Sequence, residues 1–137
     1  AEPMADRIIG FRLDVATGAL SDRRVVAELP MPDNIELDAS GRLWVASPIA
    51  NALLLVDPES GEWSTAFHHE TAEHARLMTE WKRRGESGEP RLELFGPDLW
   101  SPLPGLVTGL ILTADGGPIY LTGLGNALVK LQPTNQP

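Results

Sequence analysis

An internal repeat constrains the fold of this chain more than any other feature. The stretch at 34–41 (NIELDASG) aligns with 109–116 (GLILTADG), and two further matches follow in the same order, 43–45 with 119–121 and 51–53 with 126–128. Repeats of roughly 40 residues per four-stranded unit are typical of a β-propeller or a similar array. Here an insertion lengthens the distance between the two copies.

The first copy of the repeat is typical of a tight hairpin. Apolar residues recur at a period of two in 35–37 (IEL) and 43–45 (LWV), which is the spacing of a strand with one buried side. The tract between them, 38–41 (DASG), supplies side-chain oxygens that cap a turn and a glycine that accepts a positive φ. Two short strands joined by a turn are therefore expected.

The same kind of pattern predicts an all-β chain of about three blades. The expected strands are 7–14 and 24–29 in one blade, 34–38, 42–46, 52–57 and 63–68 in a second, and 107–113, 118–122 and 127–132 in a third. Residues 133–137 read as a polar tail, so the third blade has no fourth strand.

One segment, 70–104, departs from this pattern and is predicted to be an insertion. Thr71 is a candidate N-cap, and basic residues at 82–84 crowd the end where a helix dipole is negative. The residues that share the apolar face are His74, Leu77, Met78 and Trp81. A short amphipathic helix is expected, followed by a Pro- and Gly-rich loop over 85–105 with a brief strand at 91–95.

Composition excludes several classes of partner. The formal net charge is −8, whereas nucleic acids and anionic membranes select clustered Lys and Arg, so neither is expected as a partner. No apolar run approaches the roughly 20 residues that a membrane-spanning helix needs. The chain has no cysteine, which removes disulfides and thiolate metal sites. The compartment stays open between secreted or periplasmic and cytoplasmic.

The candidate site is the pair Asp33 and Asn34, immediately before the first hairpin. Carboxylate and amide oxygens suit Ca²⁺ or Mg²⁺, although Pro-Asp-Asn is also ordinary turn chemistry. The repeat favours a specific use for the acid, because Asp33 aligns with Thr108 and the blade therefore does not require an acid there. Ser47 and Thr122 should lie at the same end, as pocket hydroxyls or as turn caps.

The sequence gives less support to other kinds of site. The spacing of His68, His69 and His74 is not that of a helical zinc site, so a solvated strand end and a helix-face histidine are expected instead. The four tryptophans are dispersed and are predicted to be packing residues. No Gly-x-Ser-x-Gly elbow or phosphate-binding loop indicates nucleophilic catalysis or nucleotide binding.

These phrases resemble a known family. The order of 11–14 (FRLD), 32–35 (PDNI), 38–46 (DASGRLWVA) and 56–58 (VDP) is similar to the later blades of the regucalcin/gluconolactonase-like six-bladed β-propellers. Strictosidine synthase-like and paraoxonase-like relatives share the Pro-Asp-Asn-Ile phrase. The resemblance covers about the first half of the chain well and the second repeat loosely. It implies that residues 1–137 form the C-terminal half of such a propeller.

The resemblance also implies a function. The family's members hold a divalent metal, usually Ca²⁺, on the propeller axis and hydrolyse lactones or esters. Asp33 matches a metal ligand near the reacting centre and is also a candidate general base, and Asn34 matches a ligand of the paraoxonase-like branch. Thr108, Ser47 and Thr122 are then candidate contacts to a small-molecule substrate.

The chain also departs from the family. The remaining ligands would lie upstream of residue 1, and 108–111 (TGLI) lacks the acid that the strictosidine synthase-like branch uses, so Pictet-Spengler chemistry is not expected. A partial propeller exposes strand edges, which predicts a partner, either a separate or cleaved N-terminal half or a second copy in a homodimer. Two functions stay open: part of a metal-dependent hydrolase, or a non-catalytic propeller module that binds a small molecule or a protein.

Overall fold

The computed structural model describes residues 1–96 and 105–132 and consists mostly of antiparallel strands. Its strands are β1 (Arg7–Leu13), β2 (Leu20–Glu28), β3 (Ile35–Leu37), β4 (Leu43–Ser47), β5 (Ala52–Val56), β6 (Trp63–His68), β7 (Val107–Leu112), β8 (Ile119–Gly123) and β9 (Val129–Leu131). The helices are α1 (Ala72–Ser87) and the 3₁₀ turns η1 (Pro3–Ala5), η2 (Leu92–Leu94) and η4 (Ala114–Gly116).

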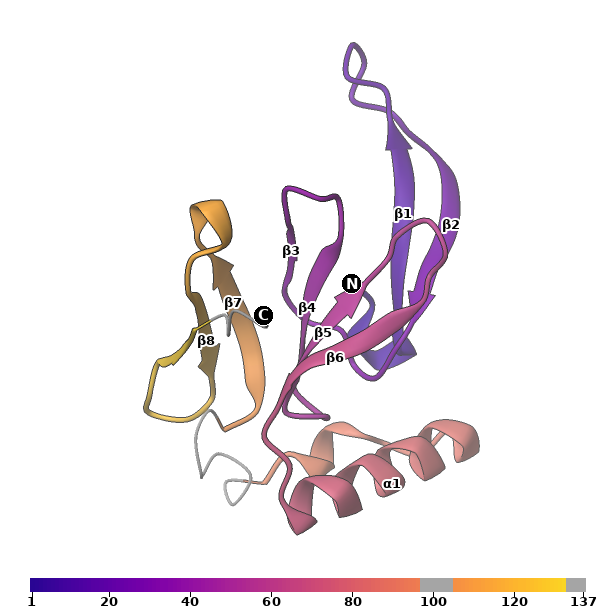
Figure 1. Cartoon of the computed structure of the whole chain (residues 1–137). Helices are drawn as coiled ribbons and strands as arrows, with labels where there is room; N and C mark the ends of the chain where they lie inside the picture. Colours follow the sequence, from indigo (N-terminus) through magenta and orange to yellow (C-terminus); the bar gives the residue numbers. More distant parts are fainter. Residues whose placement is uncertain (97–104, 133–137) are drawn as a thin grey trace.

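The described strands form three sheets that follow the chain order. The sheets have the strand orders β1-β2, β3-β4-β5-β6 and β7-β8-β9, each a simple antiparallel meander. Figure 1 shows them side by side, with the four-stranded sheet in the middle and α1 at the end opposite the β3–β4 turn. This arrangement confirms the predicted fold class, a partial, propeller-like all-β fold with one short helix.

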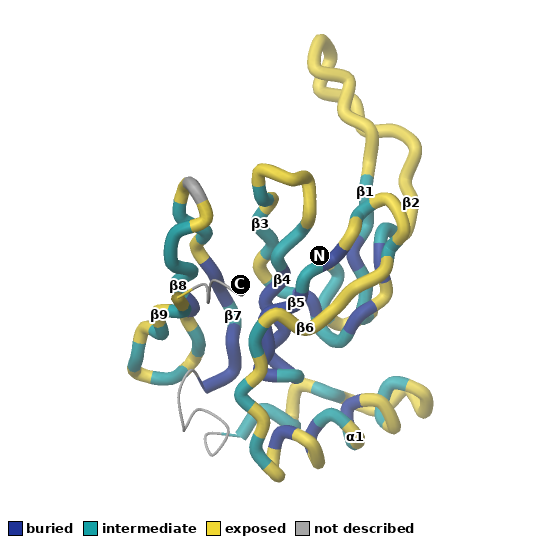
Figure 2. The backbone as a smooth tube through the Cα atoms, viewed as in Figure 1, coloured by how far each residue is buried: buried dark blue, intermediate teal, exposed yellow. Residues whose placement is uncertain are grey.

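The two central strands of the middle sheet, β4 and β5, are buried on both sides. Alternate residues of β5 point to opposite sides, so Ala52, Leu54 and Val56 pack toward β1 and β2, whereas Leu53 packs toward β7 and β8. Val45 and Ala46 of β4 divide in the same way. The result is one hydrophobic layer on each side of the middle sheet, and Figure 2 shows its inner strands as the most buried part of the sheets.

The β1–β2 hairpin extends past the other sheets. The two strands pair as predicted, but β2 begins at Leu20 rather than at residue 24, and two bulges interrupt its register with β1. The exposed tip of this hairpin is visible in Figure 2. Bulges increase the local twist of a strand pair, which accounts for the way the arm turns away from the middle sheet.

Helix α1 confirms the predicted N-cap and runs longer than predicted. Thr71 Oγ1 accepts a hydrogen bond from the His74 amide at 3.2 Å, and the helix ends at Ser87 with Gly88 in the left-handed conformation, φ 70°. The prediction of a loop from residue 85 was therefore wrong by one helical turn. Gly85 was interpreted as the start of the loop, but the helix continues through Gly85 and is capped by Gly88.

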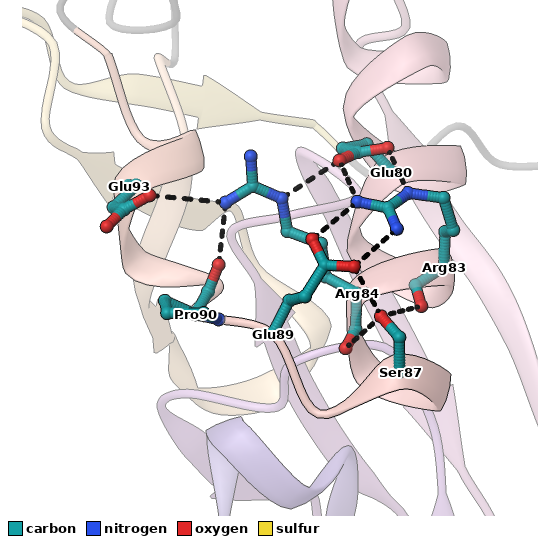
Figure 3. A network of polar contacts seen from close by, with 7 residues as sticks. All are labelled: Glu80, Arg83, Arg84, Ser87, Glu89, Pro90 and Glu93. Atoms are coloured by element: carbon teal, nitrogen blue, oxygen red, sulfur yellow. Dashed lines mark hydrogen bonds and ion pairs between the residues drawn. The ribbon is translucent and has the colours of Figure 1, made fainter.

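Ion pairs fix the end of α1 and the segment after it. Glu80 accepts hydrogen bonds from both Arg83 and Arg84, Arg83 also binds Glu89, and Arg84 donates to the Pro90 carbonyl at 2.6 Å. Figure 3 shows this network closing over the last turn of the helix. These guanidinium groups hold the pKa of Glu80 and of Glu89 at about 2, well below the ordinary value of a glutamate.

The predicted strand at 91–95 was also wrong. Residues Leu92–Leu94 form the 3₁₀ turn η2, and the Arg91 side chain turns back to the Asp6 carboxylate, with Nη1 to Oδ2 at 2.7 Å. The Arg91 guanidinium also lies over the Trp81 ring, 4.7 Å from its centre. These contacts hold the segment against α1.

The described helices include none that is long and apolar enough to cross a membrane. Trp100 and the polar tail at 133–137 lie outside the described residues.

Candidate functional site

The Asp33–Asn34 pair continues the β3–β4 ladder toward the α1 end of the sheets. The Asp33 amide donates to the Ala46 carbonyl at 2.9 Å, and the Ala46 amide donates to the Asn34 carbonyl at 2.9 Å. The backbone of both residues is therefore fixed by the neighbouring strand. Their side chains are left free for other contacts.

The Asp33 carboxylate is half-buried and has no hydrogen-bond donor within residues 1–96 and 105–132. Burial raises the pKa of this carboxyl above its ordinary value, because the charged form loses solvation that no donor replaces. The acids of the turns behave differently, since backbone amides lower the pKa of Asp57. A partly desolvated acid without a partner is a recognised mark of a functional site.

Asn34 joins the first repeat to the second. Its Nδ2 donates to the Thr108 carbonyl at 2.6 Å, which links the edge of the middle sheet to the edge of the third. Gly109 aligns with Asn34 in the repeat and lies beside it, because a Cβ at Gly109 would be 3.6 Å from Asn34 Nδ2 and 2.5 Å from Thr122 Oγ1. The structure therefore brings Asn34, Thr108 and Thr122 together.

Ser47 lies elsewhere in this end of the fold. Its side chain is fully buried, and Oγ donates to the Pro30 carbonyl at 2.6 Å, so this hydroxyl ties the end of β4 to the chain before the candidate pair. The geometry matches the turn-capping alternative of the sequence analysis. Its assignment as a substrate contact stays a prediction.

Two residues that hold this region together were missed from the sequence. Glu36 Oε2 accepts the Leu112 amide at 2.9 Å, and Asn51 Oδ1 accepts the Val107 amide at 3.1 Å, while Asn51 Nδ2 donates to the His69 carbonyl at 3.1 Å. A polar residue between two apolar ones in a short strand was the available signal for Glu36. For Asn51 the signal was its recurrence in the repeat.

The predicted metal ligands among the described residues, Asp33 and Asn34, would by themselves supply only part of a metal site. Asp33 and Asn34 offer two adjacent hard oxygens, and the unpartnered carboxylate fits a cation such as Ca²⁺. No group of three or more His, Cys, Asp or Glu side chains suited to a metal occurs in the described ranges. Ca²⁺ takes six to eight oxygens, so further ligands would have to come from beyond this set.

The histidines fulfil the structural expectation. His68 is exposed at the end of β6, whereas His74 is buried on the inner face of α1, with Nδ1 2.8 Å from Thr71 Oγ1. Burial is the main cause that lowers the pKa of His74, and the neighbouring His69 and His68 add to the shift. His74 is therefore a buried packing residue of α1.

A cleft of about 810 Å³ lies at the other end of the sheets, between the β3–β4 and β7–β8 turns. Leu53, Leu112, Ile119 and Leu131 are among the apolar side chains that line it, and Glu36 and Arg42 are among the charged ones. The Trp44 indole also lines it and donates to Asp38 Oδ2 at 2.9 Å, which fixes the ring. The cleft is spatially separate from the end that carries Asp33.

Fold and site together define a propeller-like β protein with a candidate hard-cation site at one end. No family model matches the chain. The chain is 34% identical to regucalcin of Danio rerio over 65 residues, which are 44% of this chain and 22% of that protein. It is 32% identical to regucalcin of Oryctolagus cuniculus over 65 residues and 38% identical to that of Bos taurus over 56 residues.

These similarities cover 44% of the chain at most, and the chain spans about a fifth of the length of the curated relatives it matches, 22%, 22% and 19%. They support a regucalcin-like relationship and nothing finer.

Proposed function

We propose that this chain is part of a metal-dependent hydrolase that acts on lactones or esters, with Asp33 and Asn34 as ligands of a divalent cation, most simply Ca²⁺. The observation that carries the proposal is the half-buried Asp33 carboxylate, which has a raised pKa and no donor within the described residues. The similarity to regucalcins supports it, because lactone hydrolysis is what the resemblance to that propeller family implies.

The chain's own residues would divide the chemistry. A bound cation would polarise the substrate carbonyl and lower the pKa of a water molecule. Asp33, a half-buried carboxylate at this position, is the candidate to accept the proton of the attacking water. Asn34 would offer Oδ1 to the cation while Nδ2 holds the Thr108 carbonyl, and the Thr122 hydroxyl, which lies beside Gly109, is the candidate to orient a substrate oxygen.

Asp33→Asn tests the proposal with little change in shape. We expect Ca²⁺ affinity, measured by calorimetry on the intact assembly, to fall at least about tenfold, and lactone hydrolysis to fall by about 10² or more. Glu59→Gln is the matched control, because it removes the same charge from an exposed turn and should change neither value. Absence of both Ca²⁺ binding and turnover in the unmutated assembly would refute the proposal.

The second candidate is a non-catalytic propeller module that binds a small molecule. The cleft between the β3–β4 and β7–β8 turns favours it, since an indole ring, apolar side chains and three charged groups line a volume large enough for a small ligand. Under this alternative Asn34 serves only to join two sheets. A ligand whose binding survives Asp33→Asn and is lost in Trp44→Ala would support the module over the hydrolase.

We also propose that residues 1–137 are the C-terminal half of a propeller and that another half, either an N-terminal partner or a second copy, completes it. Within residues 1–96 and 105–132 the β1–β2 sheet has two strands, and the side turned away from the middle sheet carries a row of large apolar residues, Phe11, Leu13, Leu20 and Val25, that are 45–62% exposed. The pairs Leu13–Leu20 and Ile9–Val25 place these residues on one face.

Light scattering coupled to size exclusion measures this assembly. We expect the mass of a complex, either with a co-purified partner or of two copies, because a free sheet edge and an apolar face of this kind drive association. A stable, compact monomer would contradict both forms of the proposal.

A further inference from the structure

Two residues with unusual backbone geometry precede the candidate site. Met31 and Leu106 occupy equivalent positions in the repeat, just before 32–34 and 107–109, and both have a positive φ, 37° and 59°. Side chains with a Cβ rarely adopt this conformation, so the surrounding structure must impose it. A non-glycine residue with a positive φ therefore precedes the first strand of two successive sheets, β3 and β7.

Helix α1 supplies the surface against which both residues pack. Leu106 is fully buried in one cluster with Ile49 and with Leu77 and Trp81 of the helix, and Met31 packs against the same cluster. The helix lies at this end of the sheets in Figure 1. Met31 and Leu106, the two residues with positive φ that precede Asn34 and Thr108, therefore both pack against α1.

One carboxylate connects the helix directly to the candidate segment. Asp6 Oδ1 accepts hydrogen bonds from Trp81 Nε1 and from the Met31 amide, each at 2.9 Å. Arg91 holds the other oxygen and covers the Trp81 ring, and Phe95 meets that ring edge-on with centroids 5.8 Å apart. Trp81 is only 2% exposed, so its indole has one well-defined position.

We infer that Trp81 is a positioning residue for the candidate site. Its indole N–H orients Asp6, Asp6 holds the Met31 amide, and Met31 sets the direction in which the chain runs through Asp33 and Asn34 into β3. The inference rests on the proposed function only for what Asp33 and Asn34 do with a ligand. The arrangement gives α1 a role in the site through packing and through the Trp81–Asp6 hydrogen bond.

Trp81→Phe tests the inference, because it keeps an aromatic ring in the cluster and removes only the N–H donor and part of the ring. We expect amide hydrogen exchange, followed by NMR without metal or substrate, to accelerate about five- to tenfold at Met31 and Asp33, whose amides donate to Asp6 and Ala46, while the slowest amides of β5 change less. Trp63→Phe is the matched control, because Trp63 Nε1 donates at the same 2.9 Å to the Glu28 carbonyl on an outer strand.

A purely structural role of Trp81 would produce a different result. Equal acceleration at the candidate segment and in β5, or the same local acceleration in Trp63→Phe, would overturn the inference. Met31→Gly provides a second variant that keeps the backbone conformation accessible and removes the side chain from the cluster; unchanged exchange at Asp33 in it would also overturn the inference. Since no ligand is present, these outcomes are independent of whether Asp33→Asn affects hydrolysis.

Discussion

Replacement of Asn51 by alanine is expected to lower the free energy of unfolding by about 3 kcal/mol. Asn51 is fully buried, and its side chain accepts the Val107 amide and donates to the His69 carbonyl, which joins the end of β6 to the start of β7. Alanine would leave both backbone groups without these partners in an apolar region. It would also place a less tolerant residue at φ 47°.

Asn126 provides the internal control for this change. It aligns with Asn51 in the repeat, but it is exposed, so Asn126→Ala should change the free energy of unfolding by no more than about 0.5 kcal/mol. Urea denaturation of the two variants measures both values. Similar losses in the two variants would show that Asn51 does not link the sheets as its contacts indicate.

Replacement of Leu53 by alanine should cost about 2 to 5 kcal/mol of unfolding free energy. Leu53 is 0% exposed at the centre of the layer between the middle and third sheets, where it packs with Val107, Leu110 and Leu121. The cavity would lie in the hydrophobic layer through which β7 packs against β4. Thermal or urea unfolding monitored by tryptophan fluorescence would measure the loss.

Two variants separate this cavity effect from other causes. Leu53→Met conserves volume and should cost less than about 1.5 kcal/mol. Leu128→Ala removes the leucine that aligns with Leu53, but Leu128 is 61% exposed, so a change within about 0.5 kcal/mol is expected. A large loss in Leu128→Ala would mean that the third sheet is covered by a partner at that position.

Local chemistry made most of the fold predictable. Alternating apolar residues located the strands, the DASG tract located the β3–β4 turn, and Thr71 located the start of α1. The errors occurred where a contact distant in sequence decided the outcome. Arg91 binds Asp6, which lies 85 positions earlier in the sequence. The segment beside this contact forms a 3₁₀ turn, although its local sequence is also compatible with a strand.

The candidate site shows the same division. Asp33 and Asn34 could be selected from the sequence because the second repeat has Thr108 and Gly109 at those positions. The bond from Asn34 to the Thr108 carbonyl, and the contact of both strained residues with α1, depend on how the sheets and helix pack. Whether Asp33 and Asn34 bind a cation stays a prediction.

The sequence by itself determined the repeat, the strand alternation and the helix, because these depend on the period of apolar residues and on turn and cap chemistry within a few positions. Only the tertiary structure decided which equivalent residue is buried: Asn51 and Leu53 lie between two sheets, whereas Asn126 and Leu128 face outward. The same strands and turns are predicted for the two copies because their local sequence patterns are similar. They differ in the fold because a residue's burial depends on the neighbour that covers it.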